Sequence, residues 1–180
     1  MWNNINTRKI ALAGILLAIS TISCYLAAWM PTSKAALIAL ASFVSGVVII
    51  ETGLRLGAAF TLGSVATAFI VMAGQPIFLI YAALFAPYGF VRACIEKLKS
   101  KPVQLLLKLA FFNAVFFLFL TLFETLVFNF EGIKKLLGMN DIDILLFIGG
   151  NIAFLLYDYV YTLAMRFYEA RLAKFVKKQN

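Results

Sequence analysis

The sequence predicts an all-α integral membrane protein, a bundle of six transmembrane helices with both termini in the cytoplasm. Of the 180 residues, 63% are hydrophobic and only 13% are charged, and the mean hydropathy is +0.95. A soluble domain is usually about half apolar. The apolar residues also form runs of the length needed to cross a bilayer, about 20 residues in a helix. Basic residues gather in the connections between these runs. Lipid is therefore the solvent that suits this composition.

The apolar runs define the spans of a single transmembrane domain. The first run is too long for the apolar core of a signal peptide, so we interpret it as a retained span. Pro87 and Gly89 interrupt the fourth run and predict a kink there. The six spans cover about residues 10–30, 35–50, 56–74, 77–95, 103–130 and 144–165.

The distribution of basic residues sets the expected orientation. With the amino terminus inside, 13 of the 16 lysines and arginines fall on the cytoplasmic side. The other side holds Lys34, Lys134 and Lys135. An excess of cations in cytoplasmic connections is the usual signature of membrane topology, and it is consistent with six spans and two cytoplasmic ends.

The composition also excludes several classes of function. The net charge of +8 is explained by topology and anionic lipid, so we expect no nucleic-acid partner. The chain has no histidine and no Gly-x-x-x-x-Gly-Lys-Ser/Thr motif, and no constellation of residues supports an enzyme. Cys24 and Cys94 are expected on opposite sides of the membrane, which argues against a disulfide or a metal site. We expect no cofactor and no metal.

Glu124 is the first candidate for a binding role. A charged group within a membrane helix costs roughly 2.5–3.5 kcal/mol on insertion scales and is a functional candidate by default. Glu124 lies near the outer end of the fifth span, and Asn151 enters the sixth span at a similar depth. The two could line a pocket open to the exterior, with Tyr81 near its rim. An anionic Glu124 would favour a ligand with positive charge or several donors. The alternative is that Glu124 forms a hydrogen bond within the bundle, or that its side chain extends to the membrane interface by snorkelling.

Asp158 is the second intramembrane carboxylate. Lys108 and Arg92 lie at comparable depth, so we expect a buried ion pair of Asp158 with one of these cations, which makes both charges tolerable in lipid. Proton coupling through Asp158 is the alternative role. Glu51 and Arg55 are four residues apart, and we expect a surface pair between them.

The amino-terminal segment carries a resemblance to a known family. Residues 7–18, Thr-Arg-Lys-Ile-Ala-Leu-Ala-Gly-Ile-Leu-Leu-Ala, are similar to the first helix of the substrate-binding S components of energy-coupling-factor (ECF) transporters. That helix usually carries Ala-x-x-x-Ala for docking on a coupling subunit, and the matching positions here are Gly14 and Ala18. The length, the six spans and the small residues of the first three spans also resemble this family.

The resemblance implies a micronutrient or vitamin uptake subunit, multi-pass in the plasma membrane of a prokaryote. It would capture a small molecule from outside, dock through Gly14 and Ala18 on a transmembrane coupling subunit, and topple in the bilayer as two separate ATPase subunits cycle. In this family the ligand lies near the outer face. By region, the residues implicated are those of 31–34, including Lys34, and Tyr81, Glu124, Asn129, Phe147 and Asn151.

Two other functions remain open at this point. A stand-alone, proton-coupled secondary transporter would use Asp158 or Glu124, and six spans would then require a homodimer. A non-transporting membrane scaffold of similar architecture would retain no small-molecule ligand.

Overall fold

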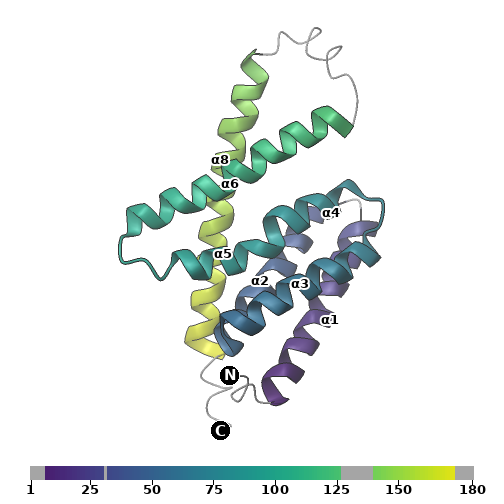
Figure 1. Cartoon of the computed structure of the whole chain (residues 1–180), viewed down its shortest axis with the longest axis vertical. Coiled ribbons are helices and arrows are strands. Elements are labelled where there is room, and N and C mark those ends of the chain that lie inside the picture. Colours follow the sequence, from purple (N-terminus) through teal and green to yellow (C-terminus); the bar gives the residue numbers. More distant parts are fainter. Residues whose placement is uncertain (1–6, 31, 127–139, 173–180) are drawn as a thin grey trace. The chain divides into compact units, whose positions relative to one another are not determined.

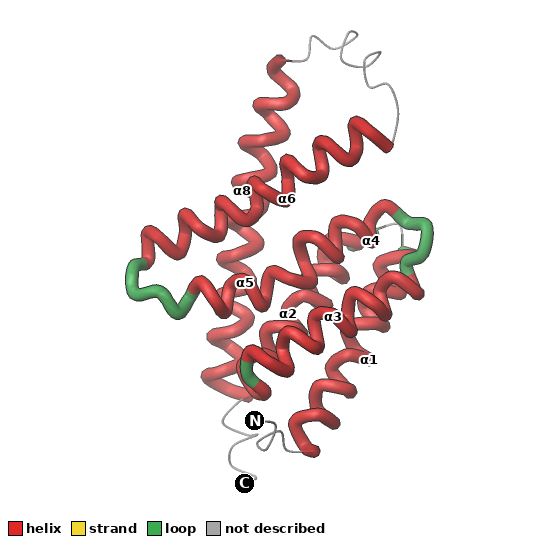
Figure 2. The backbone as a smooth tube through the Cα atoms, in the orientation of Figure 1, coloured by secondary structure: helices red, strands yellow, loops and turns green. Residues whose placement is uncertain are grey.

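Helices make up all the regular secondary structure of the described residues. The computed structural model describes residues 7–30, 32–126 and 140–172, with side chains placed in 7–30, 32–119 and 147–170 (Figures 1 and 2). Within these ranges, five helices are long and apolar enough to cross a membrane. The chain is therefore an all-α, multi-pass membrane protein, as its composition predicts. The side of the membrane on which each terminus lies stays a prediction, and so does the single domain.

The structure divides into two compact units, of which the first comprises residues 1–99 and 164–180. In this unit α1 packs against α2 and α3, and α2 also contacts α3 and α5. The segments α4, η1 and α5 follow one another without a break and form one membrane-length rod. The bounds are α1 (Thr7–Trp29), α2 (Lys34–Thr52), α3 (Leu54–Val71), α4 (Pro76–Ile80), η1 (Tyr81–Phe85) and α5 (Ala86–Ile95).

The second unit, residues 100–163, is a pair of long helices. These are α6 (Lys101–Leu126) and α8 (Asn140–Phe167), whose last residues belong to the first unit. The two helices cross each other in Figure 1. At every described end, the helices agree with the predicted spans to within four residues. The predicted end of the fifth span, at residue 130, lies outside the described residues.

Small residues form much of the core of the first unit. Ala27, Ala41, Ala68 and Ala86 are buried there together with Cys24, Ile38, Met72 and Tyr81. Small side chains allow helix backbones to approach closely, which in a bilayer replaces the missing hydrophobic drive for association. Gly57 extends this pattern, because a Cβ at its position would collide with the Ile49 side chain.

The turn between α2 and α3 depends on one glycine. Gly53 has φ 90° and ψ 171°, a conformation that residues with a side chain rarely adopt, and it ends α2 and begins α3 at the same residue. This break has a consequence for Glu51 and Arg55, which belong to different helices. The prediction of an ion pair between them is wrong, because a four-residue spacing brings two side chains together only on one continuous helix.

Glu51 instead ties the carboxyl-terminal part of the first unit to α2. The Tyr168 hydroxyl, in the π-helical turn η2 (Tyr168–Leu172), donates to Glu51 Oε1 over 2.8 Å. Burial raises the pKa of the Tyr168 phenol, and its hydrogen bond to Glu51 adds to this effect. The phenol therefore keeps its proton, and the donor that binds Glu51 is retained, throughout the physiological range.

The rod formed by α4, η1 and α5 contains a π-helical turn near Pro87 and Gly89, the residues that predict a kink. This turn, η1, ends two residues before Pro87, which cannot donate a backbone hydrogen bond. The carbonyl of Phe85 accepts a hydrogen bond from the Ser42 hydroxyl of α2 over 2.6 Å. A side chain of a neighbouring helix thus provides a partner for a backbone group beside the irregular turn.

The contact between Gly57 and Ile49 gives a test of this packing. We expect Gly57→Ala to lower the thermal midpoint of unfolding in detergent, because overpacking typically costs about 1–3 kcal/mol, more than the roughly 1 kcal/mol that alanine gains over glycine in a helix. The matched control is Gly14→Ala, where a Cβ would meet nothing within 4 Å. Equal midpoints for the two variants would contradict the close approach of α2 and α3.

Candidate functional site

The helix pair of the second unit holds an ion pair between two largely buried side chains. The Lys108 Nζ of α6 lies 2.9 Å from Oδ1 and 3.2 Å from Oδ2 of Asp158 on α8. The two side chains are 8% and 15% exposed. Lys108 is one of the two cations predicted as partners of Asp158. Arg92 lies in the first unit, where its guanidinium pairs with Glu96 over 2.7 Å.

A second polar contact joins the same helices. Asn113 and Asn151 exchange two amide hydrogen bonds, each 3.2 Å long. Each side chain also donates to the backbone carbonyl four residues earlier, Asn113 to Leu109 over 2.9 Å and Asn151 to Phe147 over 2.8 Å. The donors of both amides therefore have partners within the helix pair, which lipid cannot supply.

Aromatic rings separate and surround these polar contacts. Phe112 stacks on Phe154 with ring centroids 4.7 Å apart, and Phe116 contacts Phe147. Gly150 makes room for Phe112, since a Cβ there would lie 3.3 Å from the tip of its ring. The polar groups of α6 and α8 thus lie in an apolar setting, where electrostatic interactions are stronger than in water.

The residues predicted to bind ligand are distributed over both units. In the second unit, Phe147 packs on Phe116 and Phe117, and Asn151 meets Asn113. Asn113 precedes Glu124 by eleven residues, about 16 Å of helix. Glu124 lies in the last described turn of α6, but its side chain is outside the described part. Asn129 lies wholly outside the described residues.

Tyr81 and Lys34 belong to the first unit. Lys34 begins α2, directly after Ser33, whose φ of 69° marks the turn. The expectation that Tyr81 lies at a pocket rim is corrected by its burial, since only 1% of it is exposed. Its hydroxyl bonds to Ser64 of α3 and lies 3.3 Å from the Ser20 hydroxyl of α1. Tyr81 therefore connects three helices within the core.

This cluster of hydroxyl groups was not predicted from the sequence. Next to it, the Thr21 hydroxyl of α1 donates to the Thr67 hydroxyl of α3 over 3.0 Å. The signal was present in the spacing, because Ser64 and Thr67 lie three residues apart within the apolar run of α3. Hydroxyl residues at such spacing within an apolar run are expected to face another helix.

The docking residues predicted on α1 lie on its surface. Gly14 and Ala18 are both exposed, and a Cβ at Gly14 would meet nothing within 4 Å. They are one helical turn apart and so share a face. Within the described ranges, no group of three or more cysteine, aspartate or glutamate side chains is placed to hold a metal ion.

Comparisons with protein-family models, with curated proteins and with solved structures found no match. Support for a function therefore comes from the geometry of this chain and from the resemblance of its first helix.

The Lys108–Asp158 pair can be tested by a double-mutant cycle. We expect Lys108→Met or Asp158→Leu alone to lower the free energy of unfolding by about 3–5 kcal/mol, because each breaks an ion pair in an apolar setting. The double variant removes both charges and is expected to recover most of this loss. The measurement is titration with sodium dodecyl sulfate in mixed micelles.

The matched control is the asparagine pair of the same two helices. Asn113→Leu/Asn151→Leu removes neutral groups, and hydrogen bonds of this kind in membranes contribute about 0.6 kcal/mol on average. If the single charge variants cost no more than the asparagine variant, the ion pair does not hold these helices together.

Proposed function

We propose that this chain is the substrate-binding membrane subunit of an ECF-type uptake transporter. In this role it captures a small, vitamin-like molecule from the exterior and docks on a transmembrane coupling subunit that two separate ATPases drive. The supporting observation is the exposed small-residue face of α1 at Gly14 and Ala18, in the segment that resembles the family's docking helix.

The small residues of the first unit are of two kinds, buried ones that pack in the core and exposed ones on α1, and the exposed ones support this role for α1. Most of the buried alanines pack inside the unit, where they bring helices together. Gly14 and Ala18 lie outside this core, and glycine within a helix is unfavourable by about 1 kcal/mol relative to alanine. A close contact with the helix of another subunit gives a reason for a glycine at this exposed position.

The source of energy fits the same proposal. The sequence contains no nucleotide-binding loop. A subunit that is moved by ATP hydrolysis must therefore couple to other chains, and this coupling requires a docking surface on the membrane domain. The ligand site is assigned to the region of Glu124, Asn129, Phe147 and Asn151, on the α6–α8 side.

Co-purification tests the proposal. Gly14→Leu/Ala18→Leu is expected to abolish association with a coupling module expressed in the same cells, because two bulky side chains keep the helices apart. The matched control is Ile15→Leu/Ile22→Leu on the same helix, at positions that are 66% and 58% exposed, and it should associate normally. Normal association of the Gly14/Ala18 variant, with an unchanged thermal midpoint, would refute docking through α1.

A proton-coupled carrier is the second candidate, because Asp158 is a carboxylate within a membrane span, and such groups form proton pathways in transporters. Its ion pair with Lys108 stabilises the charged form, so proton uptake by Asp158 would require this pair to open. The candidate ligand is first identified by mass spectrometry of small molecules released from the purified protein. Reconstituted alone in vesicles, a carrier accumulates that ligand under a proton gradient, and Asp158→Asn removes the accumulation. Uptake that instead requires ATPase partners excludes this candidate.

A further inference from the structure

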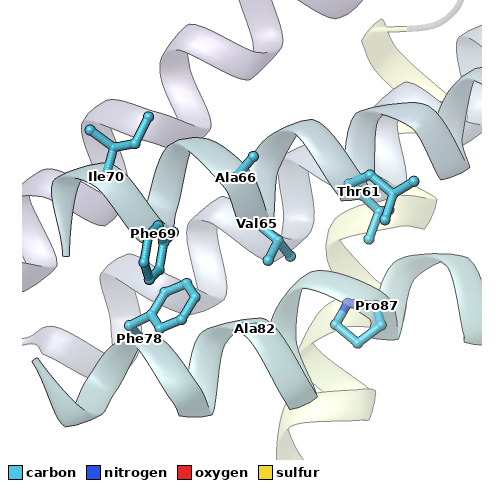
Figure 3. Close-up of a pocket in the computed structure, with 9 residues that line it drawn as sticks. Thr61, Val65, Ala66, Phe69, Ile70, Phe78, Ala82 and Pro87 are labelled. Atoms are coloured by element: carbon cyan, nitrogen blue, oxygen red, sulfur yellow. The ribbon is translucent and has the colours of Figure 1, made fainter. Parts of the chain in front are cut away.

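The surface of α3 and of the rod that follows it contains an apolar groove of about 700 Å³. This volume lies within the range of small-molecule sites, about 300–1,000 Å³. Figure 3 shows Val65 of α3 directed toward the facing rod, and the rings of Phe69 and Phe78 next to each other. The lining residues are Thr61, Leu62, Val65, Ala66, Phe69, Ile70, Phe78, Ala82 and Pro87.

The chemistry of the lining selects an apolar occupant. Thr61 carries the one side-chain polar group of this lining, and its hydroxyl donates to the Gly57 carbonyl over 3.0 Å. The alanines leave room between the helices. At the far end, Phe69 and Phe78 pack edge to face with centroids 5.4 Å apart. Leu62 and Ile70 are 73% and 74% exposed, so the groove is open along its length to the surrounding solvent, which is lipid here.

A cation lies in line with the groove. Arg55 is in the first turn of α3, seven residues before Leu62 and fourteen before Phe69, and this spacing places the three on one face of the helix. Arg55 is exposed, and no ion pair to it is present in the part of the chain that the structure describes. The Glu51 carboxylate, its expected partner, binds Tyr168 instead.

The dimensions match those of one leaflet. From Arg55 to Ala66 the helix rises about 16 Å. The hydrocarbon region of one leaflet is about 15 Å thick, half of a core of about 30 Å. A guanidinium binds a phosphate through paired hydrogen bonds. A headgroup at Arg55 therefore brings its acyl chain along Leu62 to Ala66, in the half of the groove next to the α2–α3 turn.

We propose that this groove binds an acyl chain of an anionic phospholipid whose phosphate is held by Arg55. The occupant is a lipid of the leaflet next to the α2–α3 turn, which the predicted orientation makes cytoplasmic. The site is independent of the proposed transport function, since it lies on α3 and the following rod and uses neither the α1 face nor the α6–α8 pair.

Lipid-specific fluorescence quenching tests the site. Trp2 and Trp29 are replaced by phenylalanine, and Leu62→Trp introduces a reporter at the exposed rim of the groove. The full chain is reconstituted in vesicles of phosphatidylcholine that contain increasing fractions of dibrominated phosphatidylglycerol, whose bromines quench a nearby tryptophan. We expect phosphatidylglycerol to be preferred about fivefold over phosphatidylcholine, the factor that one arginine contributes beside an anionic headgroup. Arg55→Gln should reduce this preference to about one.

Two controls separate the groove from a general surface charge. Lys9→Gln removes an exposed cation of α1 and should leave the preference at the reporter unchanged. Ala66→Phe fills the groove but keeps Arg55, and it should abolish the preference without lowering the thermal midpoint.

Three results would overturn the proposal. The first is a preference that survives Arg55→Gln. The second is a preference that survives Ala66→Phe. The third is efficient disulfide dimerisation through Leu62→Cys in a Cys24→Ser/Cys94→Ser background, which would show that a second copy of the chain occupies the groove.

Discussion

The bilayer provides no hydrogen-bonding partner, so every polar group of a membrane span must find one within the protein. Each polar contact described above satisfies this requirement. The carboxylate of Asp158 is matched by an ammonium group, the amides of Asn113 and Asn151 bind each other, and the hydroxyls of Ser20 and Ser64 meet at Tyr81. These contacts decide which helix faces meet, because apolar side chains are as well solvated by lipid as by one another.

The two units meet this requirement with different side chains. In the first, alanine and glycine bring backbones together, and hydroxyl groups such as those of Thr21 and Ser42 make short contacts. In the second, long helices are held by a charged pair and an amide pair with phenylalanine rings between them. In the first unit, small residues allow each helix to contact several others. In the second, α6 and α8 are joined by a few specific contacts between larger side chains.

Hydropathy predicted the fold class and the helix ends well, because the cost of exposing a polar backbone to lipid is large and local. Rotation of each helix about its axis was harder to predict, since a span that is apolar on all sides has no marked inner face. Tyr81 was therefore expected at a rim and is buried. Glu51 and Arg55 were paired by spacing alone, but Gly53 starts a new helix between them. The contact of Asn113 with Asn151 was not predicted either, since it depends on the register between α6 and α8.

The π-helical turn at Tyr81–Phe85 changes the angular phase of the rod that contains it. A π turn holds one residue more than an α turn, and each residue of an α-helix advances by about 100°. A single helical wheel drawn for residues 76–95 therefore assigns the wrong side to everything after the turn. Pro87 faces the same groove as Phe78 only because this extra residue is present. Losing it would rotate half of one groove wall away while leaving the composition of the span almost unaltered.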